Sequence, residues 1–317
     1  MQKDVNGGMN LQDRNPISDS LDKLSGAELI EEQIFGLPSP NITQQDMLKL
    51  SHAITHKVRS KHIDGVVVTH GTDTLEETAY FLELTVPPIV PVVVTGAMRP
   101  VGELGSDALY NYQCAIRVAM SDSAKHVGTT VVFNGEIHDA KDVTKINTTN
   151  VAAFQSPGSG IIGFVTDKSV VFTRSLPQRP HYDITGITKN VMLIKAFAGM
   201  DKSIFDAFDA LAEKLGHYPF DGLVIEAFGA GNLPQRLIDC LKKLTNMGIP
   251  IVLASRCPVG TVESLYDYPG GGMNLKEKEV KDIIFSNGLS GVKSRLKLAV
   301  LLEKTCDIKE LESEFMR

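Results

Sequence analysis

The sequence predicts an α/β protein with a larger N-terminal domain, whose mostly parallel sheet is flanked by helices, and a smaller C-terminal α/β domain. From about residue 45, amphipathic helical stretches alternate with short apolar runs rich in Val and Ile, as parallel sheets with crossover helices require. A polar stretch with two prolines interrupts this alternation at residues 175–190, and the alternation then restarts. A length of 317 residues is sufficient for two such domains.

The N-terminal domain is expected to span residues 1–174. Its clearest strand candidates are continuous apolar runs, which is typical of strands covered on both faces. These runs are residues 64–70, 91–96 and 128–133. The helices predicted between them lie at about residues 45–60, 73–84 and 106–121.

Residues 175–190 are interpreted as an interdomain linker, because prolines and polar residues replace the periodic pattern there. The C-terminal domain is then expected to span residues 191–317. Its predicted strands are residues 191–195, 221–226, 249–254 and 283–286. Its predicted helices lie at about residues 202–215, 234–246 and 291–302.

The composition argues against several classes of partner and cofactor. The formal net charge is −6 and no basic block is present, which disfavours nucleic acid as a partner. No apolar run approaches the ~20 residues that span a bilayer, so no membrane partner is expected. Nucleotide-binding glycine motifs and metal-ligand clusters are absent from the sequence, so neither a cofactor nor a metal is expected. The four cysteines lack a disulfide pattern, which favours a cytoplasmic location.

The end of the first predicted strand carries an unusual polar segment. Residues 69–77 read Thr-His-Gly-Thr-Asp-Thr-Leu-Glu-Glu, and open α/β sheets bind ligands at the carboxyl ends of parallel strands. Thr74 and Glu77 have the spacing of a capping box, which predicts the start of a helix. Thr72 and Asp73 have no such structural explanation. For this segment alone, a capped turn without function remains open beside a binding site.

Two further segments are candidates for a ligand-binding or catalytic site. Residues 95–97, Thr-Gly-Ala, end the second predicted strand, and their small side chains let a ligand approach the backbone closely. Lys145 lies in the run Asp-Val-Thr-Lys-Ile-Asn-Thr-Thr at residues 142–149. By itself this lysine is compatible both with a solvated surface charge and with a buried general base.

Together and in this order, four segments resemble the bacterial-type L-asparaginase family. They are residues 69–74, residues 95–99 (Thr-Gly-Ala-Met-Arg), residues 142–145 (Asp-Val-Thr-Lys) and residues 229–233 (Gly-Ala-Gly-Asn-Leu). The resemblance extends over essentially the whole chain, and the first segment is highly specific for the family. It implies an amidohydrolase that converts L-asparagine and water to L-aspartate and ammonia by threonine nucleophilic catalysis, with no metal or cofactor.

The resemblance also implies a role for individual residues. Thr72, Lys145 and Asp73 resemble the family's catalytic group, in which the lysine accepts a proton from the threonine hydroxyl or an associated water. Asp73 would in addition hold the α-ammonium of the substrate. Ser39, in the segment Leu-Pro-Ser-Pro-Asn-Ile, resembles the serine that binds the α-carboxylate.

Three further positions are expected to contribute to substrate binding. Gly71 and Ala97 would line the site with backbone groups, and Ala97 is a candidate for contact with the side-chain amide. Asn232 resembles a residue that the family contributes to the site of the neighbouring subunit. The resemblance therefore implies a homodimer, or a homotetramer built from two such dimers, with sites at the subunit interface.

One departure from the family pattern concerns the beginning of the chain. The family begins with a short apolar strand that ends in Thr-Gly-Gly-Thr, and the last threonine is generally regarded as the nucleophile. No such segment occurs in the 317 residues, so we expect the natural start to lie upstream of Met1 or the chain to be truncated there. Loss of four or five buried aliphatic side chains would cost about 10 kcal/mol. The 317-residue chain is therefore expected to be impaired.

Two alternative functions remain open at this point. The same fold serves as the amide-hydrolysing subunit of an archaeal-type tRNA amidotransferase, although no additional domain for a partner enzyme is visible in the sequence. A non-catalytic protein could also use Ser39 and Asp73 to bind an amino acid. Glutamine remains open as a second substrate, because one methylene changes binding by only ~1–3 kcal/mol.

Overall fold

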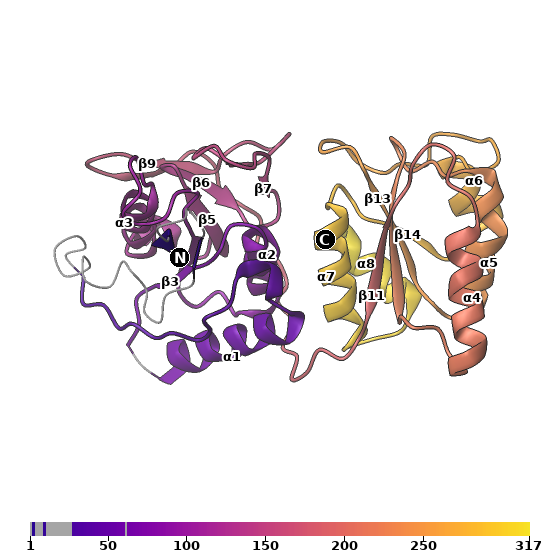
Figure 1. The fold of residues 1–317 in the computed structure, drawn as a ribbon, viewed down its shortest axis with the longest axis horizontal. Helices are drawn as coiled ribbons and strands as arrows, with labels where there is room; N and C mark the ends of the chain where they lie inside the picture. Colours follow the sequence, from indigo (N-terminus) through magenta and orange to yellow (C-terminus); the bar gives the residue numbers. More distant parts are fainter. Residues whose placement is uncertain (1, 4–8, 11–26, 61) are drawn as a thin grey trace. The chain divides into compact units, whose positions relative to one another are not determined.

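The chain divides into two α/β units, Met1–Asp183 and Ile184–Arg317, in the computed structural model. The structure describes residues 2–3, 9–10, 27–60 and 62–317. The division falls within the stretch 175–190, which contains no helix or strand. Each unit is a sheet with helices on its faces (Figure 1), and the predicted fold class is thereby confirmed.

The first unit is built on a six-stranded sheet with the strand order β10-β9-β6-β5-β4-β3. Strands β3, β4 and β5 are parallel, whereas every pairing from β5 to β10 is antiparallel. The elements of this unit are η2 (Ser39–Asn41), α1 (Gln44–Ser60), β3 (Val66–Thr69), α2 (Leu75–Thr85), β4 (Val92–Thr95), α3 (Ala108–Ala119), η3 (Asp122–Ala124), β5 (Thr129–Phe133), β6 (Glu136–Asp139), β7 (Thr144–Lys145), β8 (Phe154–Gln155), β9 (Gly163–Val165) and β10 (Val170–Phe172).

Alternate side chains of the parallel strands pack against different helices. Val92 and Val94 of β4 lie in the core with side chains of α1 and α2, whereas Val93 packs against α3. This follows from the period of two along a strand. Strands β4 and β5 are accordingly buried throughout, as their continuous apolar runs predict. Among the described strands, β3 forms an edge of the sheet and its valines are half-buried.

The parallel pairing brings the ends of β3 and β4 to one edge of the sheet. Thr69 is paired with Thr95 in the last register of the two strands, and the His70 N–H donates to the Thr95 carbonyl at 2.8 Å. The Thr95 hydroxyl is buried and donates to the Val132 carbonyl of β5 at 2.7 Å. The two polar segments singled out in the sequence therefore leave the sheet beside each other.

Strands β7 and β8 form a small hairpin outside the six-stranded sheet. Lys145 is paired with Phe154, and the Ile146 N–H donates to the Ala153 carbonyl at 2.7 Å. Phe154 is buried and its ring lies 4.7 Å from that of Phe133 on β5, measured between centroids. The hairpin is thus attached to the core through Phe154.

The second unit has a four-stranded parallel sheet with the order β11-β12-β13-β14. Helices α7 and α8 cover one face, and α4 and α5 cover the other (Figure 1). Its elements are β11 (Val191–Lys195), α4 (Ser203–Leu215), β12 (Gly222–Ala227), η4 (Gln235–Leu237), α5 (Ile238–Asn246), β13 (Ile251–Ser255), α6 (Gly272–Asn274), a π-helical turn (Leu275–Glu279), β14 (Ile283–Phe285), α7 (Gly291–Leu302) and α8 (Ile308–Met316).

The N-terminal segment contains two short strands, β1 (Gln2–Lys3) and β2 (Met9–Asn10), which pair antiparallel with each other. Neither of these two strands is among those predicted from the sequence. The apolar first strand that the family resemblance implies lies outside the described residues, so the expectation that it is missing stays a prediction. Among the helices of the described chain, none combines the length and the apolar character that crossing a membrane requires.

Candidate active site

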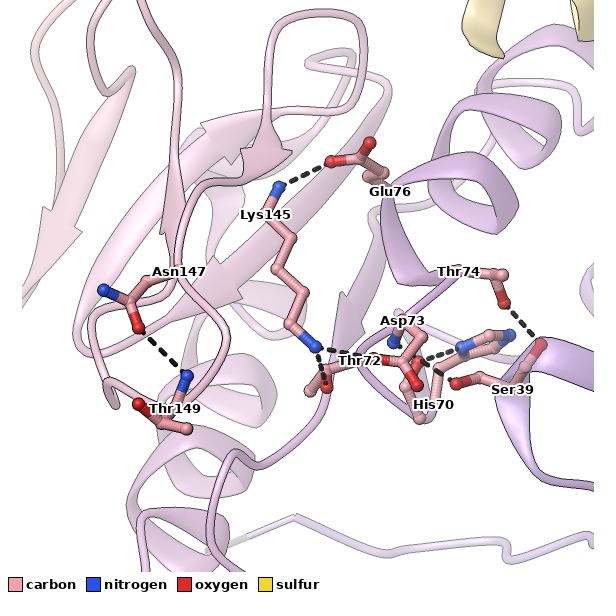
Figure 2. Close-up of polar contacts among 10 residues, drawn as sticks. Ser39, His70, Thr72, Asp73, Thr74, Glu76, Lys145, Asn147 and Thr149 are labelled. Atoms are coloured by element: carbon pink, nitrogen blue, oxygen red, sulfur yellow. Dashed lines mark hydrogen bonds and ion pairs between the residues drawn. The ribbon is translucent and has the colours of Figure 1, made fainter.

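The side chain of Lys145 bridges two of the predicted site residues at the carboxyl end of β3. Its Nζ donates to Thr72 Oγ1 at 2.9 Å and to Asp73 Oδ1 at 2.7 Å (Figure 2). The lysine side chain is 18% exposed and that of Asp73 is 60% exposed. The amine is therefore largely covered by protein, while the carboxylate remains open to a ligand. Residues that are 73 positions apart in the sequence meet here because the β7–β8 hairpin lies beside the β3–α2 turn.

Ser39 supports the turn that carries Thr72 and Asp73. Its Oγ accepts the Asp73 N–H at 3.2 Å, and its carbonyl accepts the Thr74 hydroxyl at 2.8 Å. Prolines flank Ser39 on both sides and restrict the backbone of this 3₁₀ turn. Thr74 is the N-cap residue of α2, as the sequence predicts, but its hydroxyl makes no capping hydrogen bond and reaches Ser39 instead. The capping-box interpretation of this hydroxyl is thus wrong.

His70 closes the same turn from the other side. Its Nδ1 lies 2.7 Å from the Gly71 carbonyl and its Nε2 lies 3.0 Å from the Thr78 hydroxyl. Because a carbonyl only accepts, the proton is on Nδ1 and the hydroxyl donates to Nε2. Burial lowers the pKa of His70, and the bond to Gly71 opposes this in part. His70 is therefore a neutral structural support for the turn near neutral pH.

Close backbone approach explains two glycines of the site. A Cβ on Gly71 would lie 2.7 Å from Ser39 Oγ, and a Cβ on Gly96 would lie 2.4 Å from the His70 carbonyl oxygen. Both distances are shorter than side chains tolerate, so the turn after β3 packs directly on Ser39 and on the turn after β4. Ala97 follows Gly96, is half-buried and packs against Ala108.

Two buried polar residues at the start of α3 hold the turn that contains Ala97, and neither was predicted from the sequence. Asp107 accepts the backbone N–H groups of Met98 and Arg99 at 3.1 and 2.9 Å. Asn111 donates to the Gly96 carbonyl at 3.0 Å and accepts the N–H of Asn134 at 2.8 Å. Their spacing of four within a predicted helix was the available signal, because it puts both on one helix face.

Asn232 belongs to the second unit, whereas the other predicted site residues belong to the first. Its side-chain oxygen accepts the Gly272 N–H at 3.0 Å, and its backbone pairs with Phe228 across a tight turn. Gly229 and Gly231 in this turn have positive φ angles of 48° and 110°, a conformation that favours glycine. Within the described residues, no group of three His, Cys, Asp or Glu side chains has the arrangement of a metal site.

The arrangement at Lys145 is suited to proton transfer at a hydroxyl. The Lys145 amine, 2.9 Å from Thr72 Oγ1, is within proton-transfer distance of that hydroxyl. The exposed Asp73 carboxylate next to it can bind a cationic group of a ligand. The geometry thus places a hydroxyl beside an amine and beside an anion that can bind a cation.

Comparison with known proteins finds asparaginase domains over both units. Residues 1–178 match the family model of the asparaginase N-terminal domain, and residues 190–315 match that of the glutaminase/asparaginase C-terminal domain. An L-asparaginase of Bacillus licheniformis is 36% identical over 268 residues, which cover 84% of this chain and 80% of the relative. A probable L-asparaginase of Deinococcus radiodurans is 39% identical over 290 residues, covering 89% and 84%.

The fold also matches a solved structure. The crystal structure of a probable cytoplasmic L-asparaginase from Campylobacter jejuni has a TM-score of 0.81 at 31% identity, covering 95% of this chain and 91% of that one. Two family domains in order and several relatives over most of the length identify the family. The chain belongs to the asparaginase family of amidohydrolases.

Proposed function

We propose that this protein hydrolyses the side-chain amide of L-asparagine to give L-aspartate and ammonia. The observation that carries the proposal is the position of the Lys145 amine, 2.9 Å from Thr72 Oγ1 and 2.7 Å from Asp73 Oδ1. Hydrolysis of an unactivated amide needs an activated nucleophile and a group that returns a proton to the leaving ammonia. A lysine amine between a hydroxyl and a carboxylate can do both.

In this mechanism a threonine hydroxyl attacks the amide carbon while the Lys145 amine accepts the hydroxyl proton. Collapse of the tetrahedral intermediate breaks the C–N bond, and the proton returns to the nitrogen, which leaves as ammonia. Water then adds to the ester carbonyl and releases L-aspartate and the threonine. Backbone N–H groups of the turns after β3 and β4, including those at Gly71 and Ala97, are the candidates for stabilising the oxyanion.

We assign substrate selection to Asp73 and Ser39. The Asp73 carboxylate is open to solvent and would bind the α-ammonium of asparagine. The Ser39 hydroxyl accepts the Asp73 N–H, so its own proton is available to the α-carboxylate. These two contacts select an α-amino acid over a simple amide. Glutamine would be a weaker substrate, since one additional methylene in a fitted pocket costs only ~1–3 kcal/mol.

We propose that the functional form is a homodimer or homotetramer in which Asn232 contributes to the site of the neighbouring subunit. The oxygen of its amide is bound by Gly272, which fixes the amide and leaves its N–H₂ group for a substrate carboxylate or amide oxygen. We also propose a cytoplasmic location. It is supported by the Campylobacter jejuni relative, which is described as a probable cytoplasmic enzyme, and by the four free cysteines of the described chain.

The test compares the 317-residue protein with its Lys145→Met variant, using the exposed Lys168→Met as the matched control. Ammonia release from L-asparagine would be followed by a coupled assay, and binding of L-aspartate by calorimetry. We expect ammonia release that Lys145→Met abolishes and Lys168→Met leaves unchanged. Aspartate binding without ammonia release would indicate a non-catalytic amino-acid-binding protein, and the absence of both would refute the proposed function.

A further inference from the structure

The backbone of Lys145 is held by a residue that touches none of the reacting groups. Glu76, in the first turn of α2, accepts the Lys145 N–H on its Oε2 at 2.6 Å (Figure 2). This bond joins residues that are 69 positions apart and belong to different elements. Glu76 takes no part in the proposed proton transfer, and no sequence motif singles it out.

The hairpin that carries Lys145 needs such a contact. Backbone N–H groups of successive strand residues point to opposite sides, and the Ile146 N–H is directed at Ala153 of the β8 side of the hairpin. The Lys145 N–H therefore points away from β8. Strand β7 has only two residues and β8 is its sole strand neighbour among the described residues. The Glu76 carboxylate thus occupies the position that a second neighbouring strand would otherwise take.

The same contact ties Lys145 to the element that carries its side-chain partners. Thr72 and Asp73 lie just before α2, and Leu75 at its start is fully buried. A carboxylate in the first turn of a helix is also favoured by the helix dipole. The bond from the Lys145 N–H to Glu76 and the bonds from its Nζ to Thr72 and Asp73 therefore fix both ends of this residue to α2 and the turn before it.

We propose that Glu76 is a positioning residue for Lys145: its carboxylate fixes the Lys145 backbone so that Nζ reaches Thr72 and Asp73 together. The inference rests on the proposed function only for its catalytic consequence, because the position of the amine can be measured without turnover. Displacement of a catalytic group by about 1 Å costs up to ~10²-fold in rate. For Glu76→Ala we therefore expect kcat to fall roughly 10- to 100-fold, with KM changed by less than about threefold.

The experiment separates position from charge with three variants of the full chain. Glu76→Ala removes the acceptor, Glu76→Gln removes the charge but keeps an oxygen for the Lys145 N–H, and Glu77→Ala changes the neighbouring acidic residue of the same helical turn. The first readout is the rate of trace acetylation of Lys145, measured by mass spectrometry relative to Lys168 in the same molecule. The second is ammonia release from asparagine.

In Glu76→Ala we expect Lys145 to be acetylated several-fold faster, because its amine is no longer held against Thr72 and Asp73. Glu76→Gln and Glu77→Ala should behave as the unmodified protein does. The proposal is overturned if Glu76→Ala leaves the acetylation rate unchanged, or if Glu76→Gln changes it equally, which would indicate an effect of charge alone. Should Glu76→Ala fail to fold by circular dichroism, faster hydrogen exchange at the Lys145 N–H in Glu76→Asp, relative to Glu77→Ala, decides the question.

Failure of the two proposals can be told apart. Faster acetylation in Glu76→Ala without ammonia release by any variant supports the positioning role and refutes asparagine hydrolysis. Ammonia release that depends on Lys145 but not on Glu76 supports asparagine hydrolysis and refutes the positioning role.

Discussion

A buried ion cluster in the first unit gives the most direct prediction about stability. Arg179 forms a bidentate pair with Asp139, at 2.7 and 2.5 Å, and lies 3.6 Å from Glu83. The side chains of Asp139 and Glu83 are only 1% and 9% exposed. Arg179→Met would therefore leave two carboxylates in a poorly solvated place without this cation. Breaking a buried pair in this way costs about 3–5 kcal/mol.

For a unit of this size, that loss corresponds to a decrease of roughly 6–20 °C in the unfolding temperature. Scanning calorimetry measures it, with Arg174→Met as the matched control, because Arg174 is exposed and its guanidinium donates to the Gly160 carbonyl rather than to a buried carboxylate. The control should shift stability by less than about 0.5 kcal/mol. Adding Asp139→Asn to Arg179→Met should restore part of the loss. Equal shifts for Arg179→Met and Arg174→Met would refute the reasoning.

Two further predictions concern the site. Burial lowers the pKa of His70 below its ordinary value of 6.5. The unfolded state therefore binds the extra proton first as pH falls, so the free energy of unfolding should decrease below about pH 6.5. Thermal unfolding between about pH 7.5 and 5 should show a smaller decrease for His70→Asn, and an equal decrease would contradict this. Gly71→Ala places a methyl group 2.7 Å from Ser39 Oγ and should weaken L-aspartate binding in calorimetry by about tenfold, the equivalent of one lost hydrogen bond. Gly186→Ala is the control, because nothing lies within 4 Å of its added methyl group, and it should have no effect.

The sequence was most informative for strands that consist of one continuous apolar run. The parallel strands β3, β4 and β5 and all four strands of the second unit lie within or next to their predicted apolar runs. Strands β6 to β10 were not predicted, because they have two to four residues each and the exposure of several alternates or is intermediate. Such segments depend on cross-strand partners rather than on local pattern. The final helix α8 was also missed, although Asp307 caps it by accepting two backbone N–H groups and is a residue type that often marks a helix start.

In the candidate site, too, some residues were predicted from the sequence and others were not. Thr72, Asp73 and Lys145 were predicted from motifs, and the structure brings them within hydrogen-bond distance. Their supports were not predicted, since Asn111 and Glu76 act through backbone groups of distant segments. A hydrogen bond from a side chain to a remote backbone group leaves no trace of its partner in the sequence, unlike the short-range bonds of caps and turns. The spacing of Asp107 and Asn111 therefore indicates a shared helix face, and only the fold shows which backbone groups they bind.

The two halves of the proposed catalytic group share a support on α2, where Glu76 accepts the Lys145 N–H, and each half has a further support of its own. Thr72 and Asp73 are fixed by Ser39 and by the start of α2. Lys145 depends on its hairpin, and the turn before the hairpin is fixed by the Asp139 carbonyl, which accepts the N–H groups of Asp142 and Val143 at 3.1 and 3.0 Å. The side chain of Asp139 is in turn held by Arg179, which lies in the segment after β10. This ion pair therefore supports the turn before the hairpin of Lys145.

Loss of that ion pair should therefore displace Lys145 while leaving the α2 turn in place. In a folded fraction of Arg179→Met, acetylation of Lys145 would increase as in Glu76→Ala, whereas binding of L-aspartate, which we assign to Ser39 and Asp73, would change little. If both properties were lost together, the site would behave as one cooperative unit, and the further supports of its two halves would not act independently.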